Sequence, residues 1–165
     1  MAADARKKIV DAAKGILLGT CSVLSVYDDK DVRVLLRSIE SAKTILTEAL
    51  KATSLSEDQL VTFNKKISHS LVDALQRTHK RVDEIIDKEN KATLTMYIET
   101  IKQEGPMIIT VSQIYLSNLA EGDKKTAKEP LDQIINRLIE LLNNIHSIVT
   151  IEQMSGYNQI DVIYL

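Results

Sequence analysis

The sequence predicts an all-α fold, an antiparallel four-helix bundle with a long N-terminal helix that extends beyond it. Apolar residues make up 44% of the 165 residues, yet there is one Phe and no Trp, so the core has to be aliphatic. Only two Pro and five Gly interrupt the chain, and both residue types disfavour helix interiors. Apolar residues recur three or four positions apart, as on one face of a helix. A chain of this length supports one ordinary core, so residues 1–153 are expected to form one domain.

The first predicted helix covers residues 3–52. Its apolar steps stay in phase across the polar residues 27–31, which contain no Gly or Pro. The pattern therefore favours one continuous helix of about 50 residues, roughly 75 Å long. Two helices joined by a bend at Asp28–Asp29 remain an alternative, because Asp is mildly unfavourable in the middle of a helix.

The second helix is predicted over residues 57–87 and has the clearest apolar face. Ser56 is placed to cap its first turn, and Gln59 completes a capping box three residues later. Its stripe consists of Leu60, Phe63, Ile67, Leu71, Leu75, Thr78, Val82 and Ile85.

A third helix is predicted over residues 91–119, interrupted at Gly105–Pro106. Proline lacks a backbone donor and crowds the preceding turn, so a kink is expected near Gln103. Its apolar positions include Leu94, Ile101 and Ile108.

The last helix is predicted over residues 127–152, after a polar loop around Gly122. Thr126 and Glu129 are spaced as a capping box, which would place Pro130 in the tolerated first turn. Residues 154–165 are predicted to form a flexible tail, because Gly156 should end the helix and the last seven residues alternate like a strand or an extended peptide.

The charges argue against several classes of partner. The 21 basic and 23 acidic side chains are scattered and leave a formal charge of −2, so no basic stripe is present for nucleic acid. No stretch reaches about twenty uncharged apolar residues, so no membrane insertion is expected. The single cysteine, Cys21, lies in an apolar stretch and is expected to be buried, which fits a reducing, cytoplasmic setting.

We find no pattern that indicates catalysis, a cofactor or a metal. His69 and His79 lie ten residues apart on one predicted helix, and His146 lies on another, so they do not have the spacing of metal ligands. The paired Glu-x-x-His ligands of carboxylate bundle enzymes are missing. Gly15 and Gly19 have the spacing that lets two helices approach closely, which is weak evidence in a soluble protein. The chain is therefore expected not to be an enzyme.

Three segments resemble the N-terminal domain of the vinculin/α-catenin family. They are DAAKGILLGTCSVLSVYDDKDVRVLLRSIESAKTIL (residues 11–46), RTHKRVDEIID (residues 77–87) and IKQEGPMIITVSQIYL (residues 101–116). The first is similar to the family's long shared helix, which belongs to two successive four-helix bundles. The similarity extends over about residues 4–150 and depends on the order and spacing of these segments.

This resemblance implies a cytoplasmic adaptor that links adhesion complexes at cell junctions, such as adherens junctions, to actin. The family's talin-binding and actin-binding bundles have no counterpart in this chain, so actin would be reached only through parts of the parent protein outside it. Whether the parent is more similar to α-catenin or to vinculin is left open.

The exposed stripe expected on the first half of the long helix is the candidate interface. The resemblance implies either a homodimer through this half-helix or binding of a β-catenin-like partner helix, and we favour the homodimer. The alternative is a self-contained bundle, a scaffold or regulatory module unrelated to adhesion. The candidate interface residues are Ile9, Ala13, Ile16, Leu17, Thr20, Val23, Leu24 and Tyr27.

Overall fold

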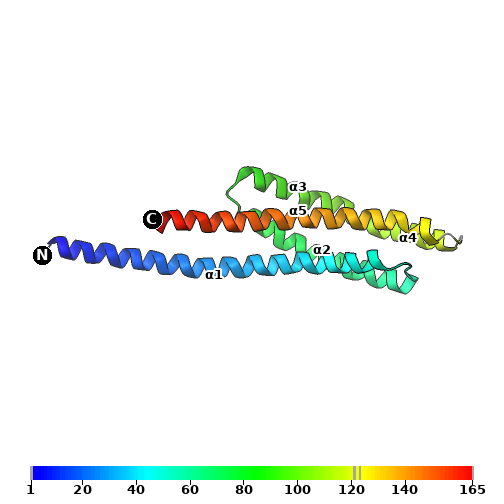
Figure 1. The fold of residues 1–165 in the computed structure, drawn as a ribbon, viewed down its shortest axis with the longest axis horizontal. Coiled ribbons are helices and arrows are strands. Elements are labelled where there is room, and N and C mark those ends of the chain that lie inside the picture. Colours follow the sequence, from blue (N-terminus) through cyan, green and yellow to red (C-terminus); the bar gives the residue numbers. More distant parts are fainter. Residues whose placement is uncertain (1, 121, 123, 165) are drawn as a thin grey trace. The chain divides into compact units, whose positions relative to one another are not determined.

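The computed structural model describes the backbone of residues 2–120, 122 and 124–164, and the side chains of residues 2–119, 122 and 126–155. The described residues form five helices and no strand, which confirms the predicted all-α class (Figure 1). The chain divides into two compact units, Met1–Val34 and Leu35–Leu165, which are described separately below.

Helix α1 runs without a break over Ala2–Lys51. The predicted continuous helix is therefore confirmed, and the alternative bend at Asp28–Asp29 is wrong. Residues 27–31 contain no helix breaker, and the Arg33 side chain donates to the Asp29 carbonyl oxygen at 3.1 Å. Two Asp residues lower helix propensity by only a few tenths of a kcal/mol each, which costs less than ending one helix and nucleating another.

Helix α2 covers Glu57–Val82 and begins with the predicted capping box. The Ser56 side chain accepts from the Gln59 amide at 3.3 Å, and the Gln59 side chain accepts from the Ser56 amide at 2.8 Å. The helix ends five residues earlier than the predicted residue 87. The amides of Glu84 and Ile85 bond to carbonyls three residues back, so the chain leaves the α-helix through a tight turn.

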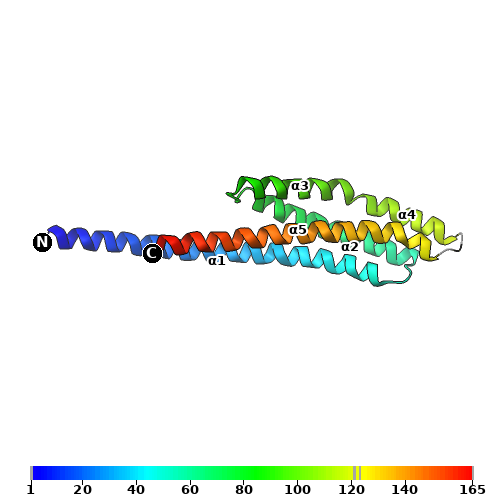
Figure 2. The same cartoon turned by 45° about the horizontal axis from the view of Figure 1, so that its top comes forward.

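Helices α3, Lys88–Glu104, and α4, Met107–Ala120, replace the single kinked helix predicted over residues 91–119. The break falls at Gly105–Pro106, because proline has no backbone N–H to donate to the preceding turn of a helix. Helix α3 begins three residues earlier than predicted, because the Asp87 side chain caps it by accepting from the Asn90 amide at 2.9 Å. Figures 1 and 2 show α3 and α4 following one another along α5.

Helix α5 covers Lys124–Tyr164, so both boundaries predicted for the last helix are wrong. It begins before Thr126, which places Pro130 inside the helix and not in its first turn. Its backbone also continues through Gly156, where the sequence predicted the start of a flexible tail. A single helix-interior glycine costs about 1 kcal/mol relative to alanine, which does not end a helix without a proline or a competing cap.

An aliphatic core holds the unit Leu35–Leu165 together. Helix α5 packs against α3 and α4, and α2 packs against the same two helices (Figure 2). The side chains of Ile39, Leu46, Ile67 and Leu138 are fully buried in this core.

Buried polar groups connect segments that are distant in sequence. The Leu55 amide donates to the hydroxyl of Tyr115 at 2.9 Å, and Tyr115 is fully buried. This bond holds the connection between α1 and α2 against α4. The Ser38 hydroxyl of α1 donates to Asp73 of α2 at 2.6 Å, and Arg77 donates to the same carboxylate. Both sites satisfy polar groups that would otherwise be costly to bury.

Lys128 of α5 is buried where α1 ends. Its ammonium donates to the Leu50 carbonyl oxygen at 2.9 Å and lies 3.1 Å from a carboxylate oxygen of Asp132. Leu50 belongs to the last turn of α1, whose carbonyls have no partner within the helix. A cation at this position also interacts favourably with the helix dipole.

Candidate interaction surface on the first helix

The eight predicted interface residues of α1 are all exposed, and we call them the α1 stripe. The exposed fractions are 70% for Ile9 and Ile16 and 62% for Leu24. Thr20 donates its hydroxyl to the Ile16 carbonyl oxygen at 2.9 Å, which leaves its methyl group to the stripe. At 100° per residue the stripe covers an arc of about 120°.

Three further apolar side chains, which the predicted stripe does not include, are exposed beside the stripe or beyond it. Val26 is 64% exposed, Val10 is 45% exposed and Leu18 is 41% exposed. They were missed because a search for steps of three and four residues selects one narrow face. The apolar surface of residues 9–27 is therefore wider than the predicted stripe.

The two ends of this apolar segment carry opposite net charge. Arg6, Lys7 and Lys8 precede it, and Lys8 pairs with Asp4 at 3.3 Å. Residues 28–31 follow it and contain three aspartates and one lysine. The basic end thus has three cations against one anion, and the acidic end has three anions against one cation.

Small and polar residues share the remaining faces of the helix with Leu18 and Val26. A Cβ atom added at Gly15 or Gly19 would meet no atom within 4 Å, so neither glycine makes a close helix contact among the described residues. Cys21 is exposed, which corrects the predicted burial. The apolar neighbours that suggested burial are themselves exposed in this segment.

The expectation that no segment has the composition of a membrane span needs correction. Helix α1 contains an 18-residue window with a mean hydropathy of 1.6 and at most two charged residues, and none of this window is buried. Residues 9–27 contain two charged residues, Asp11 and Lys14, whereas the sequence-based expectation considered only stretches without any charge. Length and composition alone are weak evidence for a membrane span, because core helices and signal sequences share them.

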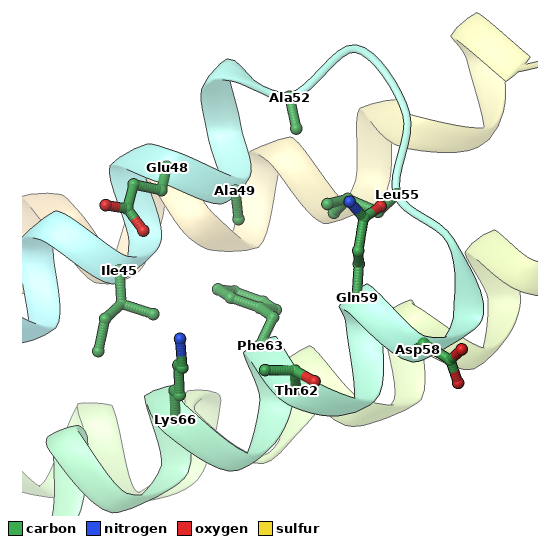
Figure 3. Close-up of a pocket in the computed structure, with 10 residues that line it drawn as sticks. All are labelled: Ile45, Glu48, Ala49, Ala52, Leu55, Asp58, Gln59, Thr62, Phe63 and Lys66. Atoms are coloured by element: carbon green, nitrogen blue, oxygen red, sulfur yellow. The ribbon is translucent and has the colours of Figure 1, made fainter.

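A groove between the end of α1 and the start of α2 has a volume of about 510 Å³. Figure 3 shows Phe63 and Lys66 of α2 pointing toward Ile45 and Ala49 of α1. A more polar hollow of about 660 Å³ lies beside Lys128. Phe63 and Ala49 in the lining of the groove are buried. Its lining residues are Ile45, Glu48, Ala49, Ala52, Leu55, Asp58, Gln59, Thr62, Phe63 and Lys66.

The described side chains contain no group of three or more His, Cys, Asp or Glu residues that could hold a metal ion. The Nε2 atom of His146 lies 3.9 Å from a carboxylate oxygen of Glu40. A pair at this distance is too long for a hydrogen bond.

Comparison with known proteins identifies the family. The vinculin family model matches residues 1–162. This chain belongs to the vinculin family. It is 26% identical to vinculin from Brugia malayi over 94% of its own length and 15% of that protein. Vinculin from Drosophila melanogaster is 25% identical, covering 94% of the chain and 16% of that protein. Catenin alpha from the same fly is 23% identical, covering 87% of the chain and 15% of that protein.

The resemblance drawn from the sequence is thus confirmed for almost the whole chain. The chain spans about one seventh of the length of the vinculin-family relatives it matches. The activity of a whole relative therefore comes to this chain only as a proposal.

Proposed function

We propose that this vinculin-family chain is a segment of a cytoplasmic adhesion adaptor and that its α1 stripe is an interface for self-association. The observation that carries the proposal is the continuous apolar surface, whose largest side chains are 55–70% exposed. Covering a large aliphatic side chain contributes roughly 2 kcal/mol. A monomeric soluble protein rarely leaves a contiguous apolar surface of this extent uncovered.

The adaptor role is supported by membership of the vinculin family. The chain would act at cell junctions by holding two copies of its parent together. Other parts of the parent would carry the contact with actin. The same stripe has the i, i+3, i+4, i+7 pattern that an amphipathic partner helix requires, so a β-catenin-like helix is the second candidate for its occupant.

Sedimentation equilibrium of the purified chain tests the proposal. The wild-type chain should sediment as a dimer at micromolar concentration, and Leu24→Glu should shift it to a monomer because the substitution places a charge in the covered stripe. Ser22→Glu is the matched control, since it introduces the same charge on an exposed position outside the stripe. The control should remain dimeric.

A wild-type chain that remains monomeric at high concentration would contradict self-association. In that case a titration with an amphipathic helical peptide tests the second candidate. Binding that Leu24→Glu abolishes and Ser22→Glu preserves would assign the stripe to a partner helix. A dimer that Leu24→Glu leaves intact would place the interface elsewhere.

A further inference from the structure

Residues 52–56 connect α1 to α2 and lie outside any helix. Three hydroxyl side chains in this connection, Thr53, Ser54 and Ser56, are exposed. The Ser56 hydroxyl is engaged, because it caps α2 by accepting from the Gln59 amide at 3.3 Å. The Ser54 hydroxyl makes no hydrogen bond to any described residue, so it is available for a reaction.

Two carboxylates follow Ser54 along the chain. Glu57 comes three residues later and Asp58 four residues later, and both are exposed in the first turn of α2. Acidophilic serine/threonine kinases select a hydroxyl residue with a carboxylate three positions after it, because basic side chains beside their active sites bind that carboxylate. Ser54 therefore has the charge pattern of a phosphorylation site.

The structure distinguishes Ser54 from the other residues with this pattern. Four hydroxyl residues in the sequence have an acidic residue three positions later, namely Ser25, Ser54, Ser70 and Thr126. Ser25 lies in α1, Ser70 in α2 and Thr126 in α5, whereas Ser54 lies outside a helix. An enzyme that acts on a segment of a chain needs that segment extended in its cleft. Exposed connections adopt such a conformation at lower cost than helix interiors do.

We propose that Ser54 is a phosphorylation site for an acidophilic serine/threonine kinase. The kinase transfers the γ-phosphoryl group of ATP: a bond forms between the Ser54 Oγ atom and phosphorus, the bond from phosphorus to the bridging oxygen breaks, and ADP leaves. The hydroxyl proton goes to a carboxylate base of the kinase. The product carries up to about two negative charges at neutral pH. The site lies outside the α1 stripe and does not depend on self-association.

A polar hollow beside Ser54 offers a place for the new phosphate. It has a volume of about 660 Å³, and both Lys51 and Lys128 line it. Lys128 already lies 3.1 Å from a carboxylate oxygen of Asp132, whereas Lys51 is exposed and makes no ion pair with a described residue. Ammonium groups form strong hydrogen bonds with phosphate oxygens. Because Asp132 and the carboxylates that begin α2 repel a phosphate, its placement depends on Lys51.

A buried hydrogen bond determines how readily this connection opens. Leu55, the residue after Ser54, is 8% exposed, and its amide donates to the hydroxyl of the fully buried Tyr115 at 2.9 Å. A kinase has to detach Leu55 before the residues around Ser54 extend in its cleft. When opening is fast relative to the reaction, the rate of modification follows the population of the open form. Loss of the bond to Tyr115 should therefore increase the rate.

Mass spectrometry after incubation with ATP, Mg²⁺ and a purified kinase of the casein kinase II type tests the site. The wild-type chain should gain a phosphate on Ser54. Thr53→Ala is the matched control, because it removes the neighbouring exposed hydroxyl and should be modified at the wild-type rate. Glu57→Gln should lower the rate by about tenfold, since it removes the carboxylate that the kinase binds. This change leaves the capping box of Ser56 and Gln59 in place.

Tyr115→Phe tests the role of the buried hydrogen bond. The rate at Ser54 should rise several-fold, to about tenfold at most, because one hydrogen bond that closes the connection is lost. Tyr97→Phe is the matched control, since Tyr97 lies on α3 and its hydroxyl makes no hydrogen bond to a described residue. The control should leave the rate unchanged.

NMR of the modified chain tests the placement of the phosphate. The amide resonances of Lys51 and Lys128 should shift on phosphorylation, and those of Glu99 and Lys102 on α3 should not. Lys51→Gln should remove the shift at Lys128, because the phosphate is then no longer held in the hollow. Shifts confined to the neighbours of Ser54 in the sequence would overturn its placement there.

Three outcomes would overturn the phosphorylation site itself. The first is that neither the wild-type chain nor Tyr115→Phe gains a phosphate on Ser54. The second is modification of Ser25, Ser70 or Thr126 in place of Ser54. The third is an equal rate for Glu57→Gln and the wild type. A phosphate on Ser54 that depends on Glu57 and forms faster in Tyr115→Phe supports the site, whether the chain is a monomer or a dimer.

Discussion

The structure lowers the pKa of the Asp73 carboxyl. Its hydrogen bond from Arg77 holds the pKa of the carboxyl below its ordinary value of 3.8, and the hydrogen bond from Ser38 acts in the same direction. The Arg77 Nε atom lies 3.1 and 3.0 Å from the two carboxylate oxygens. Because Ser38 belongs to α1, ionised Asp73 stabilises the contact between α1 and α2.

The lowered pKa predicts the pH dependence of an Asp73→Asn variant. A carboxyl with a depressed pKa contributes stability above its ordinary pKa, and this contribution is lost as the pH falls through the folded-state value. The variant should therefore be less stable than the wild type at pH 7, by less than about 1 kcal/mol because the Asp73 side chain is 42% exposed. Urea unfolding at pH 7 and pH 2.5 measures this difference.

The difference between the Asp73→Asn and wild-type chains should shrink at the lower pH. Asp4→Asn is the control, because Asp4 is 70% exposed and its pair with Lys8 is exposed as well. It should leave the free energy of unfolding within about 0.5 kcal/mol of the wild type at both pH values. A loss for Asp73→Asn that is equal at both pH values would contradict the role of the ionised carboxylate.

The structural roles of some residues could be predicted from the sequence, and those of others could not. Ser56 and Gln59 form a local pattern, so their capping box was predicted correctly. The sequence-based prediction ended the second helix at Asp87, although Asp is itself a favoured N-cap residue and its side chain accepts from the Asn90 amide. The bond from Leu55 to Tyr115 spans 60 residues, and periodicity along a helix carries no information about such a partner.

At the scale of the helix, the buried Lys128 determines how α1 ends. Its side chain is 8% exposed, and Lys128→Met should keep most of its packing while removing the bond to the Leu50 carbonyl oxygen. The substitution also leaves a buried carboxylate oxygen of Asp132 without a compensating cation. We expect the free energy of unfolding to fall by about 2 kcal/mol, measured by chemical denaturation.

Lys102→Met provides the matched control for Lys128→Met. Lys102 pairs with Glu99 at 2.7 Å, and the two side chains are 50% and 55% exposed. Breaking this pair should cost less than about 0.5 kcal/mol. Adding Asp132→Asn to Lys128→Met should recover part of the loss, because it removes the uncompensated charge. Equal effects of the two lysine variants would show that Lys128 does not cap α1.

The continuity and the ends of a helix could be predicted where neighbouring residues in the sequence determine them. The spacing of apolar residues stays in phase across residues 27–31, which was sufficient to predict that α1 is continuous. The break between α3 and α4 follows from Pro106. The ends of α5 were predicted wrongly because Thr126 is able to begin a helix and Gly156 is able to end one, but neither residue forces the helix to begin or end there. A residue that is able to cap or end a helix does so only when the neighbouring turns offer no better set of hydrogen bonds.

Across the whole molecule, stability and association depend on different parts of the sequence. The buried apolar side chains of the described residues extend from Val32 to Val149, and none of residues 2–27 is buried. The eight residues of the α1 stripe therefore contribute no core contact. Periodicity predicted both sets, because the same spacing marks an apolar face whether or not a partner covers it. It could not predict which face is covered.

This separation predicts the behaviour of a chain that lacks residues 1–27. Its melting temperature at low concentration should lie within about 2 °C of the full chain, because the deletion removes no buried side chain. The full chain should melt at a higher temperature as its concentration rises, since association stabilises the folded state by mass action, and the shortened chain should show no such dependence. Calorimetry over a hundredfold range of concentration measures both effects.

If the shortened chain unfolded at low concentration, residues 2–27 would have to support the core. If it retained the concentration dependence, the association would have to lie outside the α1 stripe.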